Sequence, residues 1–178
     1  MSAVRQQIDE LIAIGDDGRM YATDPERLRS LVQSELAREP ELSQSELRQV
    51  GVGFIVLGDY GRAQRILGEA VEQAATAHQR VAALVNLGDA HRYPGSLDAA
   101  EPLYRQAIAI ARAEAPGILH FALQHYGKHL IDVGTPHIAV EVLTEVLAMR
   151  ERLGDAVLIE STRAALGAAR AASARRTI

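Results

Sequence analysis

Pairs of glycines recur along this chain in a fixed register, and this repeat constrains the fold more than any other feature. The first glycine of each pair is followed seven residues later by another glycine, twelve residues later by an alanine and sixteen residues later by a large side chain. Successive units begin 37 and 39 residues apart. The three units carry these positions as Gly51, Gly58, Ala63 and Leu67, as Gly88, Gly95, Ala100 and Tyr104, and as Gly127, Gly134, Ala139 and Leu143. Because repeats of about 20 to 50 residues indicate stacked units, the sequence predicts a repeat protein without a single central core.

Each unit is predicted to form two helices joined by a tight turn. Apolar residues recur at three- and four-residue spacing, for example Leu84 and Leu87 and then Tyr104 and Ile108, which is typical of one helix face. The second glycine stands where the chain reverses, and glycine tolerates the positive φ angle that such a turn requires. The first glycine lies inside a helix, where it costs about 1 kcal/mol relative to alanine. We therefore expect two helix backbones to approach closely there.

Helix start signals set the predicted boundaries. Ser43 and Glu46 have the spacing of a capping box, and Ser96 and Thr135 are expected to cap the second helices of the second and third units, with Pro136 at the first helical position after Thr135. The predicted domain spans residues 41–178, with repeats over about 44–79, 81–115 and 119–153 and a C-terminal capping helix over 156–173.

The first 40 residues follow the repeat poorly. Apolar residues from Val4 to Ile14 predict a helix that ends near Gly15, and Asp24 with Pro25 predicts the start of a second helix that runs up to Pro40. We interpret residues 1–40 as a degenerate repeat or capping helix pair, with an unrelated arm as the alternative. The linker at 16–23 is expected to be the most mobile segment.

Three fragments carry a resemblance to a known family. They read LGDYGRA at 57–63, NLGDAH at 86–91 and LDAAEPLYRQA at 97–107. This pattern resembles the tetratricopeptide repeat, a helix-turn-helix unit of about 34 residues, in the longer variant of kinesin light chains and bacterial regulators. The resemblance covers about residues 44–178. It implies an all-α fold, a right-handed α-solenoid of antiparallel helix pairs with a C-terminal capping helix.

Composition excludes several classes of function. The formal charge of −4 gives no overall basic field for nucleic acid, and a chain without cysteine has no disulfide, thiolate metal site or cysteine nucleophile. No run reaches the roughly 18 apolar residues of a membrane span, and the N-terminus lacks the apolar core of a signal peptide. We therefore expect a cytoplasmic protein with neither a nucleic acid nor a membrane as its partner.

The sequence offers little chemistry for catalysis. It has no glycine-rich phosphate loop and no nucleophile elbow. The strongest alternative is a metal-dependent enzyme that uses His125, His129 and Asp132, which recur at helical spacing. Because the family's fold would turn His129 away from the groove, we favour packing or surface histidines. The prediction is a non-enzymatic protein without catalytic residues, bound metal or cofactor.

The resemblance implies that ligands lie in a concave groove lined by the first helices of successive units. Amide side chains there can pair with an extended backbone, basic side chains with carboxylates, and an arginine beside a tyrosine is a frequent binding hot spot. The candidate partner-binding residues are Arg48, Gln49 and Val52, then Asn86, Asp89, Arg92 and Tyr93, and finally Phe121, Gln124, His125 and Lys128. The predicted partner is a peptide or helix of another protein, of unknown identity. The alternative is a homodimer formed through the N-terminal helices or the alanine-rich last helix.

Overall fold

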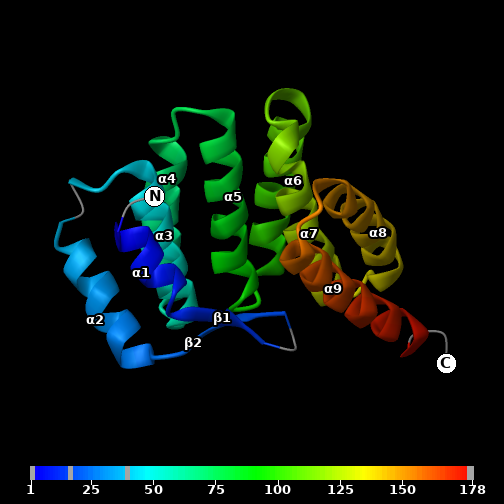
Figure 1. The fold of residues 1–178 in the computed structure, drawn as a ribbon, viewed down its shortest axis with the longest axis horizontal. Helices are drawn as coiled ribbons and strands as arrows, with labels where there is room; N and C mark the ends of the chain where they lie inside the picture. Colours follow the sequence, from blue (N-terminus) through cyan, green and yellow to red (C-terminus); the bar gives the residue numbers. More distant parts are fainter. Residues whose placement is uncertain (1–2, 16–17, 39–40, 176–178) are drawn as a thin grey trace.

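Helices stacked side by side make up most of the molecule (Figure 1). The structure is a computed structural model and describes residues 3–15, 18–38 and 41–175. Its elements are α1 (Ala3–Asp9), β1 (Ile12–Ile14), β2 (Met20–Ala22), α2 (Pro25–Leu36), α3 (Gln44–Val56), α4 (Tyr60–Glu72), α5 (Ala77–Arg92), α6 (Leu97–Glu114), the 3₁₀ turn η2 (Pro116–Ile118), α7 (Leu119–Asp132), α8 (Pro136–Leu153) and α9 (Ala156–Arg175). From α3 onward each helix packs against the next one in the chain. The predicted stack of helix pairs is confirmed, whereas the division into domains at 1–40 and 41–178 stays a prediction.

The second glycine of each repeat ends the first helix of a pair. Gly58, Gly95 and Gly134 have φ angles of 76°, 92° and 79°, in the left-handed region that only glycine enters at little cost. The amide after each glycine bonds back to the preceding helix, for example from Asp59 to the Phe54 carbonyl at 2.9 Å. The predicted role of these glycines as turn residues is confirmed.

The first glycine of each repeat makes room for the next helix. A Cβ atom at Gly51, Gly88 or Gly127 would lie within 2.5 to 2.7 Å of the nearest side-chain atom. That side chain belongs to Leu67, Tyr104 and Leu143 respectively, the large residues of the repeat. The close approach is therefore between a glycine and a large side chain of the following helix, where the sequence had suggested two backbones.

Helix capping follows the sequence only in part. The backbone N–H of Ser43 donates to Glu46 Oε2 at 2.9 Å, which confirms the predicted capping box of α3. Ser96 and Thr135 occupy the N-cap positions of α6 and α8 as predicted, but neither side chain makes the capping hydrogen bond. The Thr135 hydroxyl donates instead to the Leu130 carbonyl at 3.1 Å and so closes the preceding turn. Pro136 occupies the first turn of α8 as predicted.

Among the described residues, the buried apolar side chains form three clusters along the stack. The first includes Leu28 and Phe54, the second is centred on Tyr104, and the third joins Leu143 to Leu166 of α9. Each cluster is built from elements that lie next to one another. This is the packing that a repeat protein requires, since each unit buries its apolar face against the adjacent one.

The N-terminal region departs from the prediction. The first helix ends at Asp9, and residues 12–14, which were expected to be helical, form strand β1. This strand pairs antiparallel with β2, with Ile14 opposite Met20. The predicted linker at 16–23 therefore contains a strand, and its residues 16 and 17 lie outside the described part. Helix α2 begins at Pro25 as predicted.

This hairpin, made of β1 and β2, runs along the stack. In Figure 1 it passes beneath the lower ends of α3 and α5 and extends toward α9. Strand β2 also contacts α3. No helix within the described residues is long and apolar enough to cross a membrane.

Candidate functional site

The first helices of the three pairs surround a cavity of about 510 Å³. The hairpin borders it through Ile14, Gly18 and Met20, and α9 borders it through Leu158 and Ser161. Ten of the eleven residues predicted for the groove line this cavity, namely Arg48, Gln49, Val52, Asn86, Arg92, Tyr93, Phe121, Gln124, His125 and Lys128. Asp89 does not, because it is fully buried beneath them.

Polar side chains of α3 and α5 meet at one end of the cavity. Arg48 Nη1 donates to Asn86 Oδ1 at 2.7 Å. Gln49 Nε2 donates to Asp9 Oδ1, which ties α1 to α3. The sequence predicted that these side chains contact a partner, and in the structure each also has a partner within the chain.

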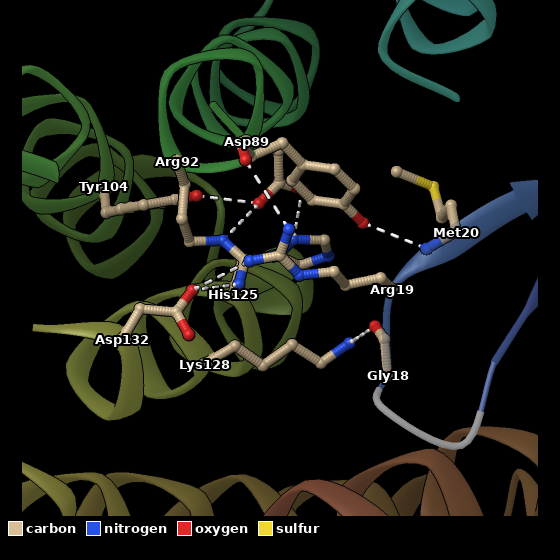
Figure 2. A network of polar contacts seen from close by, with 10 residues as sticks. Gly18, Arg19, Met20, Asp89, Arg92, Tyr104, His125, Lys128 and Asp132 are labelled. Carbon is tan, nitrogen blue, oxygen red and sulfur yellow. Dashed lines mark hydrogen bonds and ion pairs between the residues drawn. The ribbon is translucent and has the colours of Figure 1, made fainter. Parts of the chain in front are cut away.

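Asp89 is the centre of a buried polar network (Figure 2). Its Oδ1 accepts hydrogen bonds from the Tyr104 hydroxyl at 2.7 Å and from Arg92 Nε at 3.2 Å. Its Oδ2 lies 2.6 Å from Nδ1 of His125. Arg92 in turn reaches Asp132 Oδ2 through Nη1 at 2.9 Å. The network joins α5, α6 and α7, so Asp89 connects two of the groove helices, α5 and α7, to each other and to α6.

The electrostatics of this network favour an ionised Asp89. Burial alone would raise the pKa of its carboxyl, but His125 and Arg92 outweigh burial and hold the pKa well below its usual range. Burial lowers the pKa of His125 in spite of the facing carboxylate. The pKa of the Tyr104 hydroxyl rises, first through burial and then through Asp89. Asp89 is therefore an internal anion that orients its neighbours.

The hairpin is attached to the cavity wall by residues that the sequence analysis had assigned to a partner (Figure 2). The backbone N–H of Met20 donates to the Tyr93 hydroxyl at 3.0 Å, and Lys128 Nζ donates to the Gly18 carbonyl at 2.9 Å. Arg19 lies over the Tyr93 ring, with its guanidinium carbon 5.1 Å from the ring centroid. Burial raises the pKa of Tyr93 to about 12. Tyr93 and Lys128 thus bind backbone groups of the hairpin, and that backbone belongs to this chain.

The three residues of the metal-site alternative point to different partners. His125 faces Asp89, and Asp132 faces Arg92. His129 is fully buried, with Nε2 at 2.6 Å from Glu101 Oε2. Across the described residues no group of three His, Asp or Glu side chains is arranged to hold a metal ion. The three side chains therefore do not converge on one site.

The end of the cavity near α9 contains residues that the sequence analysis missed. Arg150 of α8 is only 2% exposed and lines the cavity together with His120. Arg150 follows Leu143 and Val146 at three- and four-residue spacing, which places it on the buried stripe of its helix. That spacing was the signal that could have revealed it. Nearby, Gln124 Nε2 donates to the Ser161 carbonyl at 3.4 Å, while its Oε1 is buried and has no hydrogen-bond partner among the described residues.

Comparisons with known proteins agree with this architecture. The family profile of the tetratricopeptide repeat matches residues 46–113. Two crystal structures of nearly identical TPR-like repeats from Podosopora anserina, from a protein named as a kinesin light chain, share the fold. One, a point variant, aligns with a TM-score of 0.59 at 19% identity and covers 86% of this chain and 78% of its own chain. The other aligns with a TM-score of 0.57 at 19% identity, with coverages of 86% and 79%. Comparison with the curated proteins found no match.

The fold and the groove therefore define a stack of helix pairs whose first helices face a shared cavity. Residues 46–113 match the tetratricopeptide repeat family, and the stack of helix pairs has the fold of tetratricopeptide repeats. Domains of this kind are in general protein-interaction modules and are typically not enzymes.

Proposed function

We propose that this chain is a non-enzymatic interaction module that takes up a short segment of a partner protein in the cavity. A volume of about 510 Å³ falls within the range of ligand pockets, about 300 to 1,000 Å³. The wall combines apolar side chains such as Val52, Ala82 and Phe121 with a larger number of polar and charged side chains. That combination suits a peptide, whose side chains are partly apolar and whose backbone needs hydrogen bonds.

The observation that carries this proposal is the amide of Gln124. Its Oε1 is buried without a hydrogen-bond partner in the described part of the chain, and the side chain lines the cavity. A buried acceptor without a donor costs about 1 to 3 kcal/mol. A backbone N–H of a bound segment would remove that cost. Gln49 and Asn86 supply one further buried amide from each of the other two first helices.

Self-association has less support. The apolar face of α9, with Ala165, Leu166 and Ala169, packs against α7 and α8 within the same chain. The large apolar side chains left exposed near this end, Leu153 and Val157, lie at the turn between α8 and α9. We therefore retain the partner segment as the proposed ligand.

The test is a selection of displayed random peptides against the purified chain, followed by affinity measurement for the selected sequences by fluorescence anisotropy. Ala82→Phe places a ring in the cavity and is expected to weaken binding at least about tenfold, a loss of about 1.4 kcal/mol. Ala99→Phe, at an exposed alanine of α6, is the matched control and should bind like the unmodified chain.

Circular dichroism and thermal unfolding verify that each variant is folded. Gln124→Leu is a second variant, which removes the unpaired acceptor without adding a ring. The proposal is rejected if no peptide is selected, or if folded Ala82→Phe and Gln124→Leu both bind as tightly as the unmodified chain.

A further inference from the structure

We propose that the end of the cavity between α7, α8 and α9 binds a carboxylate of the partner segment, with the Arg150 guanidinium as its counter-ion. This inference rests on the proposed function and names the chemistry that its ligand must carry. The carboxylate comes either from a chain terminus or from an Asp or Glu side chain, and the experiment distinguishes the two.

Arg150 is a buried cation that has no carboxylate beside it among the residues that the structure describes. Its Nε donates to His120 Nδ1 at 3.3 Å, and its Nη1 donates to the Leu158 carbonyl at 3.0 Å and to Thr162 Oγ1 at 2.9 Å. All three acceptors are neutral. Within the described residues no acidic side chain forms an ion pair with Arg150, and Asp155 acts on it only from longer range. A buried charge is costly unless it is paired.

Arg92, also a buried arginine that lines the cavity, differs from Arg150 in having carboxylate partners. Arg92 is 4% exposed and forms ion pairs with both Asp89 and Asp132. Arg150 is equally buried and lines the same cavity, yet it faces only neutral acceptors. The fold therefore neutralises one guanidinium internally and leaves the other for an anion that enters the cavity.

Arg150 and its surroundings also offer N–H donors that suit a carboxylate. To the described residues Arg150 donates through Nε and Nη1, so within that part of the chain both N–H groups of Nη2 are left to donate. His120 accepts at Nδ1, so its ring hydrogen is on Nε2, which is a second donor at the cavity wall. The first turn of α7, whose N-cap has no side-chain hydrogen bond, lies at the same end. A carboxylate accepts from several such donors at once.

Charge around the whole cavity points the same way. The chain has a formal charge of −4, yet its cavity is lined by Arg48, Lys128 and Arg150 besides the internally paired Arg92, with Asp9 as the acidic residue among the lining side chains described. Asp9 is on α1 and is held by Gln49, away from α8 and α9. A concave site with charge opposite to that of the whole chain favours an anionic ligand.

The protonation states fit this role. Burial lowers the pKa of Arg150 to about 10, so the guanidinium is still charged at neutral pH. Burial, and then Arg150, lower the pKa of His120, so its ring is neutral and donates without adding a second charge.

The first experiment uses three pools of synthetic random hexapeptides on the full chain, with bound peptides identified by mass spectrometry. One pool has a free C-terminus and no Asp or Glu, one has Asp or Glu and an amidated C-terminus, and one is amidated without Asp or Glu. We expect binders from the first or the second pool, which names the source of the carboxylate, and none from the third. The inference is overturned if peptides of the third pool bind with the same affinity as those of the first or second pool.

The second experiment tests Arg150 itself with a peptide from the first experiment. Arg150→Met is expected to lower the affinity of the chain for that peptide at least tenfold. A loss of this size is in the range found when one partner of a buried charged pair is removed. Arg152→Met, at an exposed arginine of the same helix, is the matched control and should leave affinity unchanged.

A measurement on the unmodified chain covers the case in which Arg150→Met does not fold. The NMR signal of the Arg150 Nε–H should shift on addition of the carboxylate peptide and stay in place with its amide counterpart. The inference fails if neither peptide moves it, or both move it alike. If peptides bind without any preference for a carboxylate, and Ala82→Phe weakens that binding, the carboxylate site is rejected and the proposed function stands. A lack of any such peptide rejects both.

Discussion

Each repeated glycine of the first helices has one large side chain of the next helix lying against it. Gly51 meets Leu67, Gly88 meets Tyr104 and Gly127 meets Leu143. The pairs recur because the same close contact between helices is built three times. The Tyr104 contact is the most demanding, since its hydroxyl is also fixed by a hydrogen bond to Asp89 and the ring cannot move aside freely.

The first prediction follows from this contact. Gly88→Ala should lower the free energy of unfolding by about 1 to 3 kcal/mol, because a Cβ 2.7 Å from the Tyr104 ring overpacks the interface. Gly68→Ala, at a helical glycine of α4 with no atom within 4 Å of such a Cβ, should raise stability by up to about 1 kcal/mol. Urea denaturation measures both. Equal effects at the two sites would show that Tyr104 yields to the added methyl group.

The second prediction concerns His125. Burial holds its pKa in the folded chain below the ordinary value, which is about 6.5. Below that pH the unfolded chain binds more protons, so this histidine contributes stability above about pH 6.5 that is lost as the pH falls through its folded pKa. We expect the free energy of unfolding to decrease from pH 7.5 to 5, by at most about 1.4 kcal/mol per pH unit from His125 alone.

His125→Gln supplies the control for that pH dependence. The glutamine amide can still donate to Asp89 but does not titrate. The free energy of unfolding of the His125→Gln variant should change less with pH than that of the unmodified chain over the same pH range. His91 and His120 also have lowered pKa values through burial, so part of the slope should persist. An unchanged slope in the variant would exclude His125 as a source.

Among the elements, the hairpin was the least predictable. Residues 12–14 read IAI, a run too short for its spacing to separate helix from strand. The hairpin is held by residues far away in the sequence, because Tyr93 contacts Met20 of β2 and Lys128 contacts Gly18 of the connecting turn. The secondary-structure propensity of the segment itself does not indicate those partners. A resemblance that begins near residue 44 could not supply them either.

The third prediction tests how the hairpin is attached. Tyr93→Phe removes the acceptor for the Met20 amide, a contact of about 1 kcal/mol. The Met20 amide should therefore exchange its hydrogen roughly fivefold faster, as measured by NMR. Tyr21→Phe changes a half-exposed tyrosine within β2 and should leave that exchange rate as it is. If both variants accelerate exchange equally, the Tyr93 hydroxyl is not what holds the strand.

Across the whole molecule, the sequence predicted the stack but only part of the site. The fixed spacing of the repeat at Gly51, Gly88 and Gly127 was sufficient to predict the fold, because a repeat protein is specified by contacts between adjacent units. The same register placed ten residues at the cavity wall. It missed Arg150, because groove residues were sought on the first helices alone, and it placed Asp89 at the surface although that side chain closes a buried network.

The last prediction follows from the division of the core into three clusters. Leu166→Asp puts a charge into the cluster shared by α7, α8 and α9, where Leu166 is 4% exposed, at a cost of about 3 kcal/mol or more. Because units of a solenoid contact only their neighbours, hydrogen exchange should accelerate in α8 and α9 while amides of α3 and α4 keep their protection. Leu28→Asp, in the first cluster, should give the reverse pattern. Uniform loss of protection in both variants would mean that the three clusters unfold as one cooperative core.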